Sequence, residues 1–311
     1  GLMVEDMLEP SKERIMPTAP FDFDMTARFA TRGLGRHAGD VYESGVYSKL
    51  LDDGDSLPLI RISSTGAVDA PKLEVEVMPT NDGDTAAANR TARSLVGADD
   101  DVTGFYGMAE RDAVLSSLVR EFRGLHIPQS ATVFEALVKS ILSQQISSQV
   151  ARVLRDGLVD AFGTTRVIDG AEWIAFPRPD AVAAASVESW RAVKLSKRKV
   201  AYITEIARAA ASGELDLEAL KTATASEATE ALIALKGVGA WTANWLLIQA
   251  LGQPDGFPHG DLALQRAMGN LAGDGQRMTA DEALDYSERW SPYRSHATTY
   301  LFAAIRQPGG P

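Results

Sequence analysis

The sequence predicts an α+β protein in which a small antiparallel sheet with a helix precedes an all-helical domain. Residues 21–97 contain short runs of β-branched residues between turn signals, whereas helical periodicity continues almost without a break from Arg111 onward. Charge divides the chain at a similar place. Residues 1–110 carry 10 Lys and Arg against 20 Asp and Glu, and residues 111–311 carry 21 against 22. We therefore expect two domains, which 311 residues are enough to form.

The N-terminal domain is expected at residues 19–108, after a disordered tail at residues 1–18 that is charged, aperiodic and contains proline. Its strand candidates are residues 41–51, 57–64 and 72–78. Turns rich in Asp, Ser and Gly separate them, and residues 86–96 follow as a helix. Together these segments predict a small sheet with a helix packed on it.

The helical domain is expected at residues 109–311. Its helix candidates are residues 111–123, 130–143, 147–162, 197–212, 225–236, 240–251, 261–271, 279–290 and 294–306. Glycine and proline signals, such as Gly163, Gly213 and Ser291-Pro292, separate several of them.

Composition excludes several classes of site. The chain has no cysteine, which excludes disulfides, thiolate zinc sites and a four-cysteine iron–sulfur cluster. No apolar run reaches the length of a membrane span, and the N-terminus lacks a signal-peptide pattern, so we expect an intracellular protein. The near-neutral helical part argues against a large basic groove and predicts modest, weakly salt-dependent affinity for polyanions.

The most informative stretch is Leu235-Lys236-Gly237-Val238-Gly239-Ala240-Trp241-Thr242-Ala243, which joins two expected helices. The G-x-G spacing lets the chain take positive φ and keeps side chains out of the way. Backbone N–H groups at the start of the second helix then point outward with the helix dipole behind them, which is an arrangement that binds phosphate. A lone L-x-G-x-G is most often only a helix C-cap and a turn.

Asp261 raises the specificity of this stretch. It lies 22 residues after Gly239, in Pro258-His259-Gly260-Asp261, and opens another expected helix. A lone Asp there is usually an N-cap. The order of hairpin and then Pro-x-x-Asp nevertheless resembles the helix-hairpin-helix/Gly-Pro-Asp DNA glycosylases of base excision repair.

Other stretches resemble the same family. They are residues 134–137 (FEAL), 141–147 (ILSQQIS), 195–200 (LSKRKV), 213–215 (GEL) and 288–295 (ERWSPYRS). Phe21-Asp22-Phe23 and the β-rich segment behind it resemble the N-terminal domain of AlkA-type 3-methyladenine DNA glycosylases. The resemblance covers nearly the whole chain past residue 20 and implies that the helical domain is a helix-hairpin-helix glycosylase domain.

The resemblance implies that Asp261 is catalytic and faces the sugar of a nucleotide swung out of the duplex. Cleavage of the N-glycosidic bond builds positive charge on the deoxyribose, which a fixed carboxylate in a water-poor pocket stabilises. The carboxylate can also orient or deprotonate the attacking water. Trp241 stands where bifunctional members carry a Schiff-base lysine, and Lys236 lies on the other side of the turn. These residues predict a monofunctional enzyme that leaves an abasic site.

The base pocket implied by the resemblance comprises Phe29, Trp241, Trp245, Leu262 and Phe302. Electron-rich rings attract the cationic N-alkylated purines, such as 3-methyladenine and 7-methylguanine. Trp241 and Trp245 are also spaced i, i+4, and aromatic residues at this helical spacing more often pack in a core. Leu262 stands where some relatives have a bulkier pocket edge, which leaves the substrate range open.

The resemblance also implies DNA contacts. Gln145 stands where relatives insert a wedge, often leucine, into the gap left by the base. The N–H groups of Gly237 and Gly239, with the hydroxyl or N–H of Thr242, are expected at a phosphate. Arg294 is expected to steer DNA.

The carbonyl groups of Ile233, Leu235 and Val238 match positions that hold a monovalent cation in the family. We therefore expect a possible structural Na⁺ or K⁺ at the hairpin, no required cofactor and no iron–sulfur cluster.

The resulting hypothesis is a monomeric, monofunctional glycosylase that flips alkylated bases out of damaged double-stranded DNA and hydrolyses the glycosidic bond. It implies a cytoplasmic location, associated with the nucleoid if the protein is bacterial, and no membrane partner. Two alternatives stay open. One is a related glycosylase for deaminated or oxidised bases, and the other is a non-catalytic protein that binds DNA damage.

Overall fold

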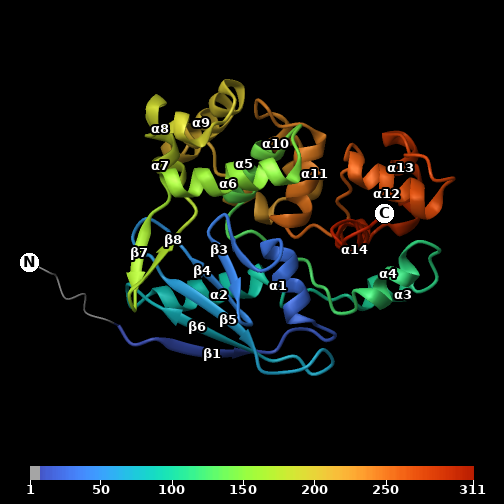
Figure 1. Ribbon diagram of the computed structural model, residues 1–311, viewed down its shortest axis with the longest axis horizontal. Helices are drawn as coiled ribbons and strands as arrows, with labels where there is room; N and C mark the ends of the chain where they lie inside the picture. The colour runs from blue at the N-terminus through green and yellow to red at the C-terminus, as the bar shows by residue number, and fades with distance from the viewer. Residues whose placement is uncertain (1–7) are drawn as a thin grey trace, which may run out of the picture.

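The computed structural model describes residues 8–311 and places a six-stranded sheet below a mostly helical body (Figure 1). The strands are β1 (Ser11–Ile15), β2 (Gly35–His37), β3 (Asp40–Glu43), β4 (Val46–Leu50), β5 (Leu59–Ser64) and β6 (Leu73–Met78). Their order is β1-β6-β5-β4-β3-β2, and every neighbouring pair is antiparallel. The predicted α+β class is confirmed.

One face of the sheet is covered by a helix because the strands alternate in polarity. In β6, Leu73, Val75 and Val77 are buried, while the two glutamates between them are partly exposed. Helix α2 (Asp84–Leu95) packs Ala88 and Ala92 on the buried side. This core holds the N-terminal unit together.

Two local expectations for this unit are wrong, and one helix was not expected. Residues 1–7 of the expected tail lie outside the described residues, but Ser11–Ile15 form β1 and pair with β6, where Ile15 is buried. Residues 41–51 form two strands instead of one, because Ser44 and Gly45 adopt positive φ and turn the chain back. Helix α1 (Phe23–Thr31), which Asp22 caps, was not expected.

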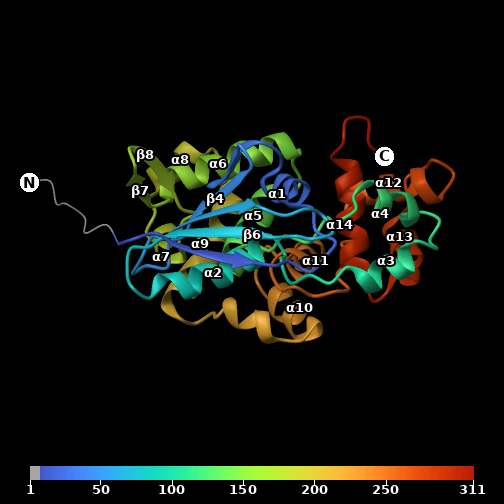
Figure 2. The ribbon, with the colours of Figure 1, turned by 90° about the horizontal axis from the view of Figure 1, so that it is seen from below.

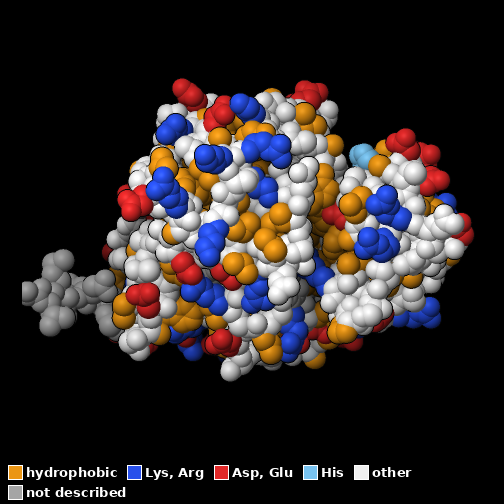
Figure 3. Space-filling model, turned by 45° about the horizontal axis from the view of Figure 1, so that its top comes forward, with side chains coloured by type: hydrophobic (Ala, Val, Ile, Leu, Met, Phe, Trp, Pro, Cys, Tyr) orange, Lys and Arg blue, Asp and Glu red, His pale blue; other side chains and the backbone are white. Residues whose placement is uncertain are grey.

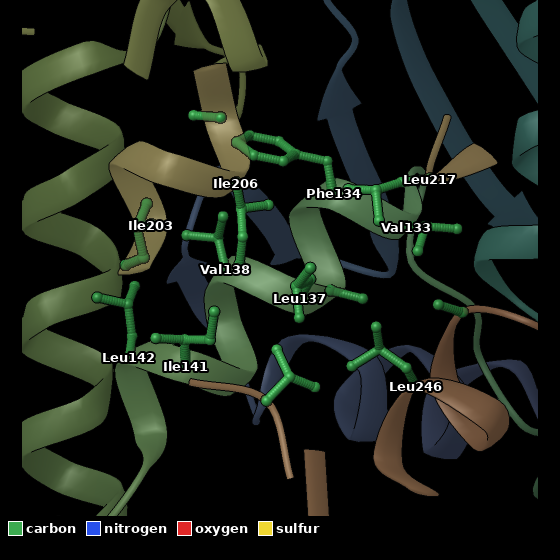
Figure 4. Close-up of a cluster of buried hydrophobic side chains, with 14 of the residues drawn as sticks. Val133, Phe134, Leu137, Val138, Ile141, Leu142, Ile203, Ile206, Leu217 and Leu246 are labelled. Carbon is green, nitrogen blue, oxygen red and sulfur yellow. The ribbon is translucent and has the colours of Figure 1, made fainter. Parts of the chain in front are cut away.

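The helical body is built around two cores. Its helices are α3 (Thr103–Ala109), α4 (Leu115–Glu121), α5 (Val133–Ser143), α6 (Ser148–Phe162), α7 (Pro179–Ala183), α8 (Val187–Val193), α9 (Lys197–Ser212), α10 (Ala225–Ile233), α11 (Ala240–Gln249), α12 (Leu262–Ala272), α13 (Ala280–Ser287) and α14 (Arg294–Ile305), with 3₁₀ turns η1 (Glu218–Thr222) and η2 (Glu288–Trp290). In the first core, α5 is surrounded on several sides, and its residues Leu137, Val138 and Ile141 belong to one buried cluster with Ile203, Ile206 and Leu246 (Figure 4).

The second core gathers α3, α4 and α12–α14 in a lobe at the right of Figure 1. Trp290 and Tyr300 are fully buried there, and Phe105 of α3 packs against Tyr300 with ring centroids 5.1 Å apart. Residues 103–109 therefore pack with the helical body, although the sequence placed most of them in the N-terminal domain.

A small hairpin inside the helical body joins it to the sheet. Strands β7 (Thr165–Ile168) and β8 (Ala171–Ile174) pair antiparallel around Asp169-Gly170, both of which have positive φ. Arg166 donates hydrogen bonds of 2.8 Å to the carbonyls of Leu57 and Met78. The β7–β8 hairpin thus ties the two units together. Within residues 8–311, no helix has the length and hydropathy needed to cross a membrane.

Candidate active site

The predicted hairpin joins α10 to α11 through Gly237. Gly237 has φ +87°, and a Cβ at this position would lie 2.3 Å from the ring of Tyr202, so both the conformation and the space require glycine. Gly239 differs. Its φ is −110° and a Cβ there would meet nothing within 4 Å. The expectation that both glycines use positive φ is wrong for Gly239. The space beside Gly239, at the start of α11, is open surface.

The start of α11 presents unpaired donors. The first N–H group that bonds within this turn belongs to Ala243, which donates to the Gly239 carbonyl at 3.0 Å. Among residues 8–311, the N–H groups of Gly239, Ala240, Trp241 and Thr242 have no acceptor. This is the arrangement that favours an anion at a helix N-terminus. The phosphate role of Gly237 and Gly239 stays a prediction.

Thr242 contributes less than expected. Its side chain is buried, and its hydroxyl accepts a 3.1 Å hydrogen bond from the Gln144 amide. The predicted contact between this hydroxyl and a phosphate is therefore wrong, since the oxygen is enclosed by its own protein. The Thr242 N–H keeps its predicted role.

Two residues that the sequence reasoning missed hold the neighbouring loop. The amide of Gln144 also donates to the Gly237 carbonyl at 2.9 Å, which ties the α5–α6 loop to the hairpin. The buried ammonium of Lys199 donates to the carbonyls of Leu142 and Gln144, at 3.0 and 2.6 Å. Burial, and then the charge of Arg198, lower the pKa of Lys199. Both residues lie in stretches that resemble the family, residues 141–147 and 195–200, but those stretches did not indicate these contacts.

The contacts of Gln144 and Lys199 hold the loop that places Gln145 at the surface. Gln145 is exposed and adopts φ +57°, an unusual conformation for a residue with a side chain. Such local strain persists only where neighbouring contacts enforce it, as those of Gln144 and Lys199 do here. The wedge role of Gln145 stays a prediction.

Asp261 is fixed by three hydrogen bonds. Its Oδ1 accepts from the backbone N–H groups of Ala263 and Leu264, at 3.0 and 3.1 Å, and so caps α12. Its Oδ2 accepts from the indole N–H of Trp241 at 2.8 Å. The carboxylate is thus held both by its own helix and by the helix that begins at the hairpin.

A cavity of about 200 Å³ lies beside this carboxylate. It is lined by Asp261, Phe29, Trp241, Trp245 and Phe302, among others. The rings of Trp245 of α11 and Phe302 of α14 meet edge to face with centroids 4.8 Å apart. Figure 2 shows both helices from below. Figure 3 shows the molecule hollowed between the main body and the lobe of α12 and α13, with hydrophobic side chains along the hollow.

Two predicted site residues lie elsewhere. Leu262 is 57% exposed and does not line this cavity, so its place at the edge of the base pocket stays a prediction. It is the first residue of α12, and the turn that aims the Asp261 side chain at Trp241 leaves Leu262 on the outer surface. Arg294 donates from Nε and Nη2 to Asp255, at 2.9 and 2.8 Å. This bidentate pair gives the guanidinium charge of Arg294 a partner within the protein, and its DNA contact stays a prediction.

One wall of the cavity is a buried ionic cluster that the sequence did not indicate. Lys49 of β4 lies 2.7 Å from Asp40 and 3.0 Å from Glu135 of α5, and Lys139 pairs with the same Glu135. Burial opposes ionisation of Asp40, but Lys49 and then Lys139 lower its pKa. The cluster joins the sheet to α5 behind the cavity.

The carbonyl groups predicted to hold a cation are placed around the hairpin turn. Among residues 8–311, those of Ile233 and Val238 receive no hydrogen bond, whereas that of Leu235 accepts the Val238 N–H at 3.1 Å. Carbonyl oxygens with free lone pairs suit a hard cation, so these residues fit the implied Na⁺ or K⁺. No group of three or more His, Asp or Glu gathers as a metal site in the described chain.

Known proteins similar to this chain share its fold and this region. Residues 138–292, which include the hairpin and Asp261, match the family model of the HhH-GPD superfamily base excision DNA repair proteins. The DNA-3-methyladenine glycosylase of Bacillus subtilis is 30% identical over 94% of this chain and 97% of its own length.

Two solved structures extend the likeness. The 3-methyladenine DNA glycosylase of Archaeoglobus fulgidus has a TM-score of 0.83 at 29% identity, covering 94% of this chain and 98% of that one. The 3-methyladenine DNA glycosylase Mag1 of Schizosaccharomyces pombe, in complex with abasic DNA, has a TM-score of 0.57 at 26% identity, covering 66% and 98%.

Proposed function

The chain belongs to the HhH-GPD superfamily of base excision DNA repair proteins, and from that premise we propose that it is a monofunctional glycosylase for alkylated bases. It releases bases of the 3-methyladenine and 7-methylguanine type from duplex DNA and leaves an abasic site. The observation that carries the proposal is Asp261, held by three hydrogen bonds at the edge of an aromatic cavity beside the hairpin.

The fixed carboxylate supports the chemical step. As the base departs, positive charge develops on the sugar, and an anion already in position stabilises it without having to reorganise. Trp241 and the start of α12 prevent the Asp261 carboxylate from turning away. Oδ1 already accepts two hydrogen bonds, but Oδ2 accepts one and keeps a free lone pair, so it can orient the attacking water and accept its proton.

The lysines near the cavity are not available as nucleophiles, which favours hydrolysis by water over a mechanism in which a lysine forms a Schiff base. Lys49 and Lys139 line the cavity, but Glu135 pairs with both. Lys236 is exposed in the hairpin turn, on the far side of Gly237 from Asp261 in sequence. Trp241, at the position of the family's nucleophilic lysine, donates its N–H to Asp261 and has no amine to react.

The aromatic residues support binding of an extruded base. Trp241, Trp245, Phe29 and Phe302 surround one cavity, and electron-rich rings favour the positive charge of N-alkylated purines. A damaged pair also costs less to open than an intact one. The free N–H groups at the start of α11 hold the neighbouring phosphate, and Gln145 fills the gap in the duplex. We propose that the protein does this as a monomer and without a required cofactor.

Replacing Asp261 with Asn tests the proposal. Asn still caps a helix, so the fold is retained while the negative charge is lost. We expect single-turnover release of 3-methyladenine and 7-methylguanine from methylated duplex DNA to fall about 100-fold or more. Asp281→Asn, which changes an exposed aspartate in the first turn of α13, is the matched control and keeps the wild-type rate.

Two results would contradict the proposal. Unchanged release by Asp261→Asn would remove the mechanism. A wild-type protein that binds methylated duplex and releases no base from it would be a non-catalytic DNA-damage binder instead.

A further inference from the structure

One face of helix α9 contacts both of the elements that are expected to meet DNA. Lys199, in the first turn of α9, donates to the carbonyls of Leu142 and Gln144 at the end of α5. Tyr202, three residues later and therefore on the same face, lies against Gly237 of the hairpin. The α5–α6 loop and the hairpin thus rest on one helix.

The ammonium of Lys199 stands where its own helix does not favour it. The N-terminal turn of a helix repels a cation, and burial of an ammonium group is costly. Lys199 is 9% exposed, and among residues 8–311 no carboxylate oxygen lies within 4.0 Å of its Nζ. Its charge is compensated by the carbonyls at the C-terminal end of α5, where the helix dipole is negative. Lys199 therefore stabilises the end of α5 at the expense of the start of α9.

The bond to Gln144 fixes the backbone just before the strained residue. The Gln144 carbonyl and the Gln145 N–H belong to one planar peptide group, and Lys199 holds that carbonyl at 2.6 Å. The side chain of Gln144 holds the same residue from another side, through its 2.9 Å bond to the Gly237 carbonyl. Within the described chain, the exposed side chain of Gln145 itself makes no hydrogen bond. The fixed peptide group and the φ of +57° thus direct a free side chain outward.

A loop fixed in this way suits the opening of a duplex. Extrusion of a base costs free energy because pairing and stacking are lost, and contacts made in the opened duplex offset this cost. A side chain that already points outward loses little conformational entropy when it enters the gap. In a loop that moved relative to the hairpin, the same contact would offset less of the cost.

We propose that Lys199 and Gln144 are positioning residues for base extrusion. They lock the α5–α6 loop to the hairpin, so that Gln145 and the N–H groups at the start of α11 meet the duplex as one rigid unit. This inference rests on the proposed glycosylase function. Neither Lys199 nor Gln144 lines the cavity at Asp261, so neither touches the reacting atoms. Their loss therefore weakens extrusion and leaves the cleavage step intact.

Two matched substrates separate extrusion from cleavage. Both carry one 7-methylguanine in the same sequence, placed opposite cytosine in one duplex and opposite an abasic site in the other. Only the first requires a base pair to be broken and leaves an orphaned base beside the gap. We would measure single-turnover release from each at saturating protein, using wild type, Lys199→Met and Gln144→Leu. Both substitutions keep an apolar stem for packing and remove the donors.

Lys199→Met is expected to slow release from the cytosine-paired duplex about tenfold, the size of one lost hydrogen bond to a charged group. Release from the unpaired site is expected to slow less than about twofold. Gln144→Leu is expected to act in the same direction and less strongly, because the bonds that it removes are between neutral groups. Lys197→Met is the matched control, since Lys197 is exposed in the same turn and its loss removes the same charge. It keeps the wild-type ratio of the two rates, and thermal unfolding reports the folding of every variant.

A double variant tests whether Lys199 acts through Gln145. Gln145→Ala is expected to lower the ratio of paired to unpaired release, and the addition of Lys199→Met is expected to lower it no further. An equal further loss in the Gln145→Ala background would mark a general structural role of Lys199 and would overturn the inference.

The remaining outcomes also decide the matter. An unchanged ratio in folded Lys199→Met overturns the inference, and Gln144→Leu decides in the same way if Lys199→Met does not fold. An equal loss on both substrates overturns it as well, because cleavage itself is then affected.

If the wild type releases no base at all, the proposed function fails, and a binding measurement still tests the loop. The probe is a duplex with fluorescent 2-aminopurine opposite a tetrahydrofuran abasic analogue, which presents the gap without any base to release. A fluorescence change that saturating wild type produces and saturating Lys199→Met does not supports the inference. An equal change with both proteins, or no change with the wild type, overturns it.

Discussion

The two ends of the cavity are assembled in different ways. At one end, the hairpin, Trp241 and Asp261 lie within 25 residues of one another in the chain, and two helix starts aim them. At the other end, Phe29 from α1 and Arg306 from the end of α14 meet across 277 residues. The first end depends on local rules of turns and caps, and the second on the packing of sheet, body and lobe.

This difference separates two tasks. The local end holds the carboxylate and the phosphate donors, which every substrate needs whatever its base. Under the proposed function, the distant end faces only the base, so changes there are expected to alter selectivity and leave the carboxylate in place. Variants of the two ends are therefore expected to differ in what they change.

The largest effect is expected from the hairpin itself. Gly237→Ala places a Cβ against the Tyr202 ring and forces a side chain into positive φ, at a cost of about 1–3 kcal/mol in the free energy of unfolding. Duplex affinity is expected to fall with it, because the start of α11 is displaced. Urea unfolding and titration of labelled duplex measure both.

Gly239→Ala is the matched control for this change. Its backbone is extended and its Cβ meets open space, so stability is expected to change by less than about 0.5 kcal/mol. Equal destabilisation by the two substitutions would contradict the unequal roles of these glycines.

A smaller effect is expected at the distant end and depends on pH. Burial, then the charges of Arg155, Lys139 and Arg32, lower the pKa of His37 from 6.5 to about 2. The folded state therefore keeps His37 neutral, while the unfolded chain takes up a proton below pH 6.5. Stability from this group is present above pH 6.5 and is lost as pH falls toward 2.

Comparison of wild type with His37→Gln at pH 7.5 and 5.5 measures this loss. The wild type is expected to lose about 1 kcal/mol more of its free energy of unfolding than the variant over this range. A variant that loses as much as the wild type would show that His37 titrates normally in the folded protein.

The difference between the local and the distant end of the cavity also decides how much of the fold and the site could be predicted from the sequence. The hairpin, the Asp261 cap and the fold class follow from glycine spacing, helix periodicity and turn residues, which act over a few neighbours. The β7–β8 hairpin was missed although Asp169-Gly170 is a strong local turn signal. Leu262 is more exposed than its adjacency to Asp261 suggests, because adjacency in sequence says nothing about which side of α12 faces the cavity.

The residues of the distant end carry no such local signal. Arg155 lies in α6 and Arg306 follows α14, and each reads as an ordinary helix arginine until the lobes are packed together. Lys199 likewise belongs to a basic run that is typical of a solvated helix start, yet its ammonium binds two carbonyls at the end of α5. Burial of this kind is a property of the assembled chain.

The central claim is that Trp241 acts through the Asp261 carboxylate, and one double-mutant cycle of base-release rates tests it most directly. Asp261→Asn is expected to slow base release about 100-fold or more. Trp241→Phe is expected to slow it about tenfold, since an aromatic ring is kept and the hydrogen bond to Asp261 is lost. The double variant is then expected to release base no more slowly than Asp261→Asn alone. A further tenfold loss in the double variant, or wild-type release by Asp261→Asn, would contradict the account.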